Sequence, residues 1–179
     1  QIIPYPHELS PAVQKMNACN CIHIQNGLLS GFNTDVIGFK NSFLKKKAAH
    51  HTKAMILGTG GAAAAVAFVL DELCIPYIYV SRKPSAANNS IHYSELDDAM
   101  MQNYTIIINT TPLGTFPNIQ FFPPIPYHCI NEHHYLFDLI YNPAETIFLQ
   151  KGRENGAITQ NGYDMLVIQA EENWKIWNG

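Results

Sequence analysis

The sequence predicts an α/β fold, a doubly wound parallel sheet with helices on both faces. From residue 53 onward, short apolar runs typical of buried parallel strands alternate with segments of helical periodicity. A glycine-rich segment at 58–61 directly follows the first of these runs and begins the first helical segment. Hydrophobic residues make up 47% and charged residues 14% of the 179 residues, which is enough apolar surface for one core and too little charge for a disordered chain.

The elements of this region follow from apolar periodicity and from helix start and stop signals. Expected strands cover residues 54–57, 76–80, 104–108, 135–140 and 157–159. Expected helices cover residues 61–73, a segment that Ser94 caps, a segment that Pro143 opens and Gly152 or Gly156 closes, and residues 164–177 with Leu166, Val167, Ala170, Trp174 and Trp177 on the apolar side. Four prolines within 116–126 predict a loop, because proline disrupts both helices and strand ladders.

Residues 1–33 have a different pattern from the rest of the chain. We expect a helix near 10–16 and a hairpin in which Asn26-Gly27 forms the turn between two short strands. This region is interpreted as part of another domain. The cationic run at 45–47 is expected to be an exposed helix end or linker.

Composition excludes several classes of protein. A formal net charge of −3 gives no general basic field, so we expect no nucleic-acid partner. The four cysteines lack zinc-ribbon spacing and the eight histidines are scattered, so we expect no bound metal and a reducing, cytoplasmic compartment. The uncharged stretch 54–70 contains several glycines and alanines, which argues against a membrane span. No signal peptide opens the chain, and without an initiating Met we expect it to begin inside a longer protein.

The glycine-rich segment predicts a Rossmann-type nucleotide site. Gly58, Thr59, Gly60, Gly61 and Ala62 lie between a strand and a helix, where backbone amides and the helix dipole can meet a pyrophosphate without a Cβ in the way. A glycine cluster alone also suits a tight turn with close helix packing. The strand-turn-helix context favours dinucleotide binding, and we expect a nicotinamide cofactor.

The end of the second strand indicates which nicotinamide cofactor binds. An acidic residue there would hold the ribose 2′-hydroxyl of NAD, whereas a guanidinium suits the 2′-phosphate of NADP. The sequence has Ser81-Arg82-Lys83 at this place, so we expect NADP, with Arg82 as a bidentate phosphate ligand and Lys83 as a point charge. The alternative is that both side chains merely solvate the end of a strand.

Five segments along the chain match motifs of one family. The most specific is Gly31-Phe32-Asn33-Thr34-Asp35-x-x-Gly38, and the others are Asn17-Ala18-Cys19-Asn20, Asn109-Thr110-Thr111-Pro112-Leu113-Gly114, Asp138-Leu139-Ile140-Tyr141-Asn142-Pro143 and Asn161-Gly162-Tyr163-Asp164-Met165-Leu166-Val167-Ile168-Gln169-Ala170. In this order they resemble the shikimate dehydrogenases, including their quinate-using relatives. The resemblance spans almost the whole chain. It implies a Rossmann-type domain with a remnant of an amino-terminal α/β substrate domain.

The resemblance also implies an activity and a set of site residues. Members of that family reversibly oxidise the 3-hydroxyl of shikimate to the ketone of 3-dehydroshikimate with NADP, in the pathway to aromatic amino acids. By position, the substrate-binding residues would be Asn20, Asp35, Tyr141 and Gln169, with Asp35 also catalytic. The cofactor-binding residues would include Asn109, Thr110, Gly162 and Met165, the last two beside the nicotinamide. A polyol does need convergent amide, carboxylate and hydroxyl groups of this kind.

Simpler explanations exist for single residues of this set. Asp35 could be a helix N-cap, and Gln169 an exposed helix residue. Asn20 could satisfy loop backbone groups, and Tyr141 could belong to a plain loop before a helix. Taken jointly and in the family's order, the positions favour the site.

The chain also departs from the family pattern. The lysine segment Asn-Val-Thr-x-Pro-x-Lys and the Ser-x-Ser pair that grips the carboxylate do not occur in the 179 residues. We therefore expect little or no turnover from these residues alone, with 1–34 as a partial substrate domain, 35–160 as the NADP domain and 161–179 as a helix returning to the substrate domain. A non-catalytic NADP-binding regulatory module and a quinate/shikimate dehydrogenase remain alternatives. The oligomeric state is expected to be monomer or homodimer.

Overall fold

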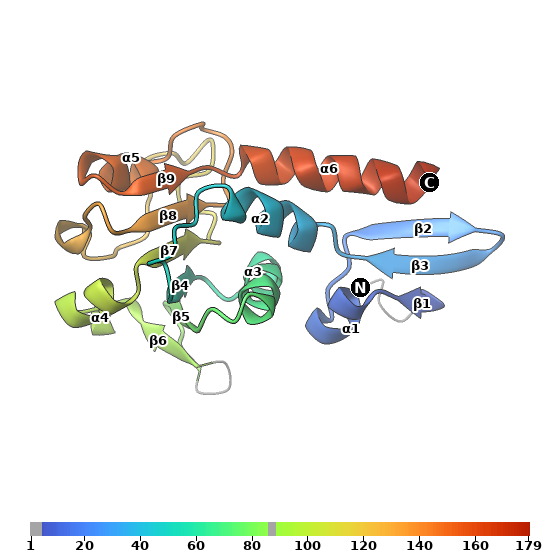
Figure 1. Cartoon of the computed structure of the whole chain (residues 1–179), viewed down its shortest axis with the longest axis horizontal. Coiled ribbons are helices and arrows are strands. Elements are labelled where there is room, and N and C mark those ends of the chain that lie inside the picture. The colour runs from blue at the N-terminus through green and yellow to red at the C-terminus, as the bar shows by residue number, and fades with distance from the viewer. Residues whose placement is uncertain (1–4, 86–88) are drawn as a thin grey trace.

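The computed structural model describes residues 5–85 and 89–179, which form a large parallel sheet flanked by helices and a small sheet beyond its carboxyl edge (Figure 1). The strands of the large sheet are β4 (Ala54–Leu57), β5 (Tyr77–Ser81), β6 (Ser90–His92), β7 (Ile106–Asn109), β8 (Tyr135–Asp138) and β9 (Ile158–Gln160). Those of the small sheet are β1 (Glu8–Leu9), β2 (Cys21–Gln25) and β3 (Leu28–Phe32). The helices are α1 (Pro11–Met16), α2 (Asp35–Leu44), α3 (Gly61–Glu72), α4 (Asp98–Asn103), α5 (Ile147–Glu154) and α6 (Tyr163–Asn178), with 3-10 turns η2 (Tyr93–Glu95) and η3 (Tyr127–Cys129).

The large sheet has the strand order of a doubly wound Rossmann fold. Its order is β6-β5-β4-β7-β8-β9, and every pair in it is parallel. The chain therefore winds outward from β4 in one direction and from β7 in the other. The reversal lies between β4 and β7, and ligands of such sheets bind outside the carboxyl ends of the strands at this place. The expected fold class is confirmed.

Both faces of the sheet are buried, because the side chains of each strand alternate between two hydrophobic clusters. In β4, Ile56 packs with the helices α2, α3 and α6, whereas Met55 and Leu57 pack with α4 and α5. All four residues of β4 are fully buried. This double coverage explains why the strands read as continuous apolar runs in the sequence.

Helices α2 and α6 lie side by side and connect the large sheet to the small one (Figure 1). A Cβ added at Gly38 of α2 would lie 2.7 Å from the backbone oxygen of Met165, so only glycine permits this approach. In the small sheet, β3 pairs antiparallel with β2 across the expected Asn26-Gly27 turn and parallel with β1. Residues 1–4 of this region lie outside the described residues.

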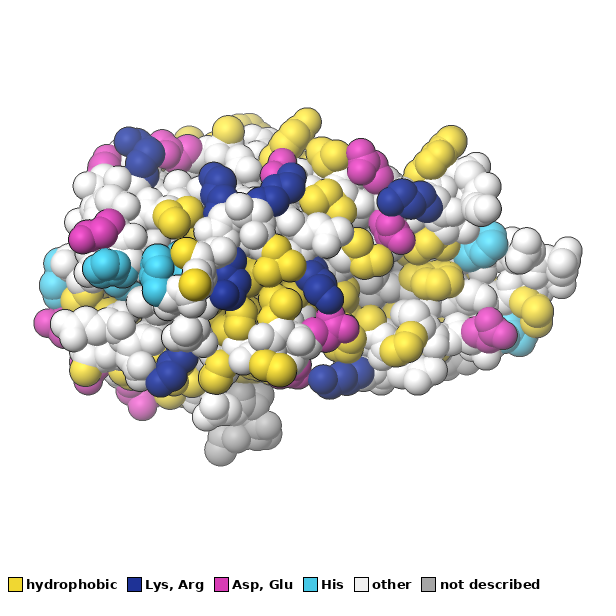
Figure 2. All heavy atoms as spheres, in the orientation of Figure 1, with side chains coloured by type: hydrophobic (Ala, Val, Ile, Leu, Met, Phe, Trp, Pro, Cys, Tyr) yellow, Lys and Arg dark blue, Asp and Glu magenta, His cyan; other side chains and the backbone are white. Residues whose placement is uncertain are grey.

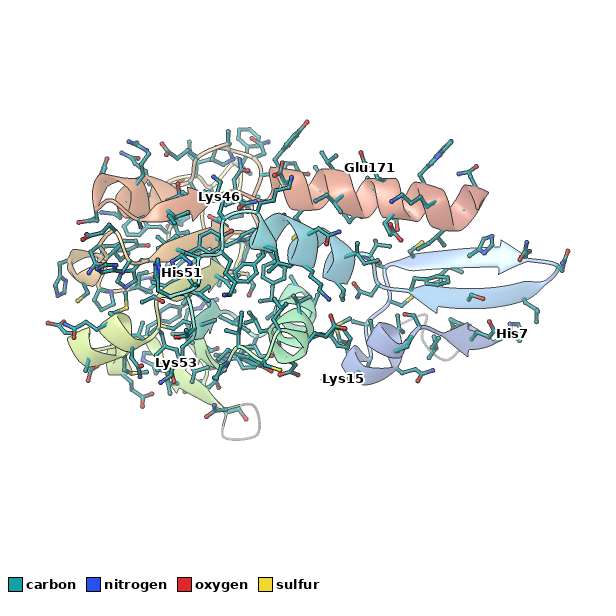
Figure 3. The ribbon with its side chains drawn as sticks, viewed as in Figure 1. His7, Lys15, Lys46, His51, Lys53 and Glu171 are labelled. Carbon is teal, nitrogen blue, oxygen red and sulfur yellow. The ribbon has the colours of Figure 1, made fainter. Side chains whose placement is uncertain are left out.

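The connection from α2 to β4 contains the cationic run and a buried histidine. The run lies at the end of α2, as expected. Lys45 pairs with Asp164 over 2.8 Å, Lys46 donates to the carbonyl oxygen of Thr159, and Lys47 donates to that of Ala48. His51 is fully buried, and its Nδ1 accepts a hydrogen bond from the amide of Ala48. Lys46 and His51 are both labelled in Figure 3. On the face in Figure 2, basic and acidic side chains are interspersed.

Two expectations about local structure are wrong, and one strand was not expected. Ser94 does not cap a helix: it lies in η2, and the carboxylate of Asp97 caps α4 by accepting from the amide of Met100. Pro143 does not open a helix, since α5 begins at Ile147 behind the cap Thr146. The edge strand β6 was not expected, because three residues between polar segments give no periodic signal.

The apolar side assigned to the last helix is also wrong. α6 packs on α2 through the i, i+4, i+8 row that contains Met165, Gln169 and Asn173. Of the residues assigned to the apolar side, Val167, Ala170, Trp174 and Trp177 are exposed, Trp174 to 67% and Trp177 to 54%, and Leu166 is half-buried. Gln169 and Asn173 are polar, so apolar periodicity does not mark the side of α6 that contacts α2. Within residues 5–85 and 89–179, no helix combines the length and the apolar character needed to cross a bilayer.

Candidate functional site

A cavity of about 250 Å³ opens at the carboxyl ends of β4, β5 and β7. Four chain segments form its wall: the glycine turn after β4, the end of β5, the start of η2, and the turn after β7. The residues that line it are Gly58, Thr59, Gly60, Ser81, Arg82, Tyr93, Thr110, Thr111, Pro112 and Leu113. The cavity therefore lies at the topological switch point of the sheet, and six of these residues were expected at a cofactor site.

The backbone at Gly58 explains the first glycine of the turn. Its φ is +107°, a value that side-chain-bearing residues rarely adopt. A Cβ at this position would also lie 2.8 Å from Oγ1 of Thr110. The hydroxyl of Thr110 donates to the carbonyl oxygen of Leu57 over 2.7 Å, so it cannot move away without loss of a hydrogen bond. Gly58 is thus required by the fold of the turn itself.

Gly60 and Gly61 differ from Gly58, because added Cβ atoms there would meet no atom within 4 Å. Packing inside the protein does not require glycine at these two positions. Gly60 is the N-cap of the twelve-residue helix α3, with no side-chain cap, and Gly61 is its first residue. The unpaired amides and the positive end of the helix dipole face open space at this point, which is the arrangement that binds a phosphate group.

The end of β5 supplies the positive charge of the cavity. Arg82 lines the cavity, and in the described part of the chain it forms no ion pair with a carboxylate. Ser81 also lines it, and its hydroxyl accepts from the amide of Lys83 over 3.2 Å. Lys83 is exposed beside the cavity and does not line it.

Tyr93 is a lining residue that sequence reasoning missed. Burial raises the pKa of its phenol to about 12, although the nearby guanidinium of Arg82 acts to lower it. Tyr93 and Arg82 both line the cavity. The signal for this residue was absent from the sequence, because Tyr93 follows the unexpected edge strand β6.

A buried network of polar side chains supports the turn after β7. Asn109 and Asp138 end the neighbouring strands β7 and β8, and the side-chain nitrogen Nδ2 of Asn109 donates to the carboxylate of Asp138 over 3.0 Å. Oδ1 of Asn109 accepts from the amide and the hydroxyl of Thr111. Asn109, expected at the cofactor site, is fully buried and supports the turn, whereas Thr110 lines the cavity.

A second polar group joins Asn20, Thr34 and Asp35 to α6. Oδ1 of Asn20 accepts from the amide of Thr34 over 2.9 Å, and the Asn20 side chain hydrogen-bonds Asp35. The hydroxyl of Thr34 donates to Oδ1 of Asn173 over 2.9 Å, and Nδ2 of Asn173 donates to Gln169 over 3.0 Å. The structure thus connects three of the four expected substrate residues.

The simpler explanation of Asp35 as a helix N-cap is wrong, since Thr34 is the N-cap of α2 and Asp35 is its first residue. Burial raises the pKa of the Asp35 carboxyl, and the hydrogen bond from Asn20 partly opposes the shift. Asn173 was missed: its i, i+4 spacing from Gln169 is visible in the sequence, but its contact with Thr34 depends on the packing of α6 against α2.

The remaining expected residues lie near the carboxyl end of β8. Tyr141 is half exposed and lines a separate cavity of about 340 Å³ with Thr115 and Phe116. In the described residues no hydrogen bond links it to Asn20, Asp35 or Gln169.

Gly162 is the N-cap of α6, and a Cβ there would collide with the backbone of Leu139. Met165 is buried between α6 and α2. Both residues therefore have packing roles that are visible in the structure.

Comparison with known proteins finds relatives that share one name. No family model matches the chain. A protein named shikimate dehydrogenase (NADP(+)) from Methanococcus maripaludis is 35% identical over 191 aligned positions, which cover 99% of this chain and 68% of the relative. A protein of the same name from Methanosphaera stadtmanae is 33% identical over 193 positions, with the same coverage. The chain spans about two thirds of the length of these relatives.

Solved structures agree with the sequence comparison. A shikimate dehydrogenase in complex with NADP+ superimposes with a TM-score of 0.85 at 30% identity, covering 99% of this chain and 67% of that one. The Thermus thermophilus shikimate 5-dehydrogenase in complex with NADP(H) and shikimate gives a TM-score of 0.86 at 27% identity, covering 99% and 69%.

Proposed function

Because the chain belongs to the shikimate dehydrogenase family, we propose that it binds NADP in the cavity between β4, β5 and β7 and serves the NADP-dependent interconversion of shikimate and 3-dehydroshikimate. In this proposal residues 35–160 bind the cofactor, and residues 1–34 and 161–179 contribute to the substrate side. Relatives with both sequence and structural similarity carry NADP and shikimate in their names.

One observation supports the cofactor half of the proposal more than any other. Gly60, over which there is open space, lines the same cavity as Arg82, which forms no ion pair with a carboxylate among the described residues. Gly61 follows Gly60 as the first residue of α3. A pyrophosphate on the helix N-terminus and a 2′-phosphate on Arg82 would use both features, whereas NAD has no group for the second. The structure requires glycine at Gly58 but not at Gly60 or Gly61, so a tight turn alone does not account for the sequence.

The substrate half is supported by the group around Asp35. Bound NADP would accept the hydride from the carbon that carries the reacting hydroxyl. Asp35 would act on the proton of that hydroxyl, since its raised pKa brings the carboxyl closer to the range in which it can both take up and release a proton. Asn20 orients Asp35, and Gln169 would contact the same substrate from α6. Tyr141 would join them from the loop after β8.

A pair of neighbouring substitutions tests the cofactor half. Arg82→Gln removes the guanidinium from the cavity, and we expect it to weaken NADP binding roughly 10- to 100-fold, the value of charge-assisted hydrogen bonds. Lys83→Gln removes one positive charge at an exposed position beside the cavity and serves as the matched control. Isothermal titration of both variants should show the larger loss in Arg82→Gln. Equal effects would indicate that the two residues act only through general charge.

A turnover assay tests the catalytic half. The 179 residues contain no Asn-Val-Thr-x-Pro-x-Lys segment, so we expect NADP binding without significant oxidation of shikimate or quinate. Addition of the amino-terminal segment of a relative that carries this lysine should restore NADPH formation from shikimate. Binding that persists while turnover is never restored would instead favour a non-catalytic NADP-binding module. Faster turnover of quinate would assign the other substrate.

The proposal also covers the cellular compartment and the oligomeric state of the protein. All four cysteines are free, and thiols stay reduced in the cytoplasm, which is where we place the protein. We propose a monomer or a homodimer, which light scattering behind a sizing column would distinguish.

A further inference from the structure

Three side chains with different metal-binding atoms converge on the surface between α4 and η3. Asp98 is the first residue of α4, and His128 and Cys129 end η3, which packs against that helix. Their ligand atoms, one carboxylate oxygen, one imidazole nitrogen and one sulfur, all lie within 4.8 Å of one another. Residues thirty positions apart in the chain thus meet at one point, with no role in the cofactor or substrate site.

The distances resemble the edges of a metal coordination tetrahedron. Oδ1 of Asp98 is 3.4 Å from Nε2 of His128 and 3.1 Å from Sγ of Cys129. Zinc bonds of about 2.1 Å to oxygen and nitrogen and about 2.3 Å to sulfur place neighbouring ligands roughly 3.4–3.6 Å apart in a tetrahedron. The third distance, from the imidazole nitrogen of His128 to Sγ of Cys129, is at most 4.8 Å, so side-chain rotation can bring the three ligand atoms to three corners of such a tetrahedron. We propose that Asp98, His128 and Cys129 form a surface site for a divalent transition-metal ion of the zinc type, with the fourth position open to water.

The carboxylate is available for this role, because it has no other task in the helix. Asp97 caps α4, so Asp98 is not needed to satisfy the first amides. The side chains of Asp98 and His128 are 72% and 74% exposed, so an ion can reach them without rearrangement of the fold. A zinc ion with one thiolate, one carboxylate and one neutral imidazole is electrically neutral, which suits a site beside a protein surface of net charge −3.

The same geometry argues against a catalytic cysteine. The thiol of Cys129 donates to Asp98, and the partial burial of the thiol and the adjacent carboxylate raise its pKa to about 11. A nucleophilic cysteine needs a lowered pKa and a base, whereas here the thiol is paired with an anion. A bound cation reverses this effect, since it replaces the shared proton and stabilises the thiolate.

Asp98, His128 and Cys129 do not line the cavity between β4, β5 and β7. Figure 1 shows α4 at the end of the molecule opposite the β2–β3 hairpin. The ion would join α4, which leads into β7, to η3, which leads into β8. Its expected effect is greater stability of these two connections, with no change in cofactor binding.

Metal titration of variants tests the proposal. The reduced protein, freed of metal with a chelator, is titrated with Zn²⁺, and Co²⁺ is added separately to record the near-ultraviolet thiolate-to-cobalt absorption. We expect one Zn²⁺ per chain, binding that is about tenfold or more weaker in Cys129→Ser and in Asp98→Asn, and loss of the cobalt absorption in Cys129→Ser. Cys74→Ser is the matched control, because Cys74 is also a free thiol and is exposed.

A second measurement guards against metal bound elsewhere on the chain. Zn²⁺ should raise the unfolding temperature of the unaltered protein and of Cys74→Ser, but not of Cys129→Ser. The proposal is overturned if Cys129→Ser keeps the Zn²⁺ affinity and the cobalt absorption of the unaltered protein, or if the absorption disappears in Cys74→Ser instead.

Discussion

The side-chain nitrogen Nδ2 of Asn109 donates a hydrogen bond to the buried carboxylate of Asp138 across the ends of β7 and β8. The carboxylate also accepts from the amide of Ile140 and, over 2.6 Å, from the hydroxyl of Thr146. One fully buried side chain therefore fixes the turn that lines the cavity between β4, β5 and β7 and the loop that carries Tyr141. Both segments belong to motifs that resemble the family, residues 109–114 and 138–143. The structure gives a physical reason for the aspartate that begins the motif at 138–143.

Removal of this carboxylate is expected to destabilise the protein strongly. Asp138→Ala leaves three donors without their acceptor, and we expect a loss of about 3 kcal/mol or more in the free energy of unfolding. Asp138→Asn keeps the shape and one acceptor oxygen and should cost about 1 kcal/mol. Urea unfolding of both variants checks the difference. A similar small loss in both would mean that the network contributes little.

Two buried groups are expected to give the stability opposite pH dependences. Burial raises the pKa of Asp138 to about 7, so its folded form binds a proton that the unfolded form has lost, and stability falls as pH rises from about 4 to 7. Burial lowers the pKa of His51 to about 4, so the unfolded form binds the extra proton below pH 6.5, and stability rises with pH between about 4 and 6.5. Each slope approaches about 1.4 kcal/mol per pH unit, and in the unaltered protein they largely cancel.

Single substitutions should expose each slope separately. In His51→Asn, whose Oδ1 can still accept from the amide of Ala48, unfolding free energy should decrease from pH 4.5 to 6.5. In Asp138→Asn it should increase over the same range. Urea unfolding at a series of pH values measures both. Parallel profiles in the two variants and the unaltered protein would show that neither group titrates as its burial indicates.

Alanine in the glycine turn should separate structural from ligand-related glycines. Gly58→Ala forces a positive φ and a close contact with Thr110, so we expect about 1–3 kcal/mol of destabilisation together with loss of NADP binding. Gly61→Ala meets no atom and lies in a helix, so stability should be unchanged or about 0.5–1 kcal/mol higher. NADP binding should nevertheless fall, because the Cβ enters the space for the pyrophosphate. Unchanged NADP binding in Gly61→Ala would favour a simple tight turn.

The contact between α2 and α6 should be sensitive to one methyl group. Gly38→Ala places a Cβ 2.7 Å from the backbone oxygen of Met165, and we expect it to cost about 1–3 kcal/mol. Asn41→Ala changes an exposed residue of the same helix and should stay within about 0.5 kcal/mol of the unaltered protein. Thermal unfolding compares the two. Equal midpoints would contradict the close approach of the helices.

The sequence predicted the parallel sheet because its strands are buried on both faces and read as apolar runs. It predicted the turn between β4 and α3 because the spacing of glycines after β4 reflects local geometry. It failed at β6, which is too short to show a period, and at the packing side of α6, where Gln169 and Asn173 contact α2 through polar groups. It could not show the contact of Asp98 with Cys129, since these residues meet only through the packing of α4 and η3.

The central claim is that this cavity prefers a cofactor with a 2′-phosphate. Isothermal titration of the unaltered chain with NADP and with NAD, at the same ionic strength, tests it most directly. The expected result is binding of NADP roughly 10-fold or more tighter than NAD, as a charge-assisted contact with Arg82 would give. Equal affinities, or tighter binding of NAD, would contradict the account.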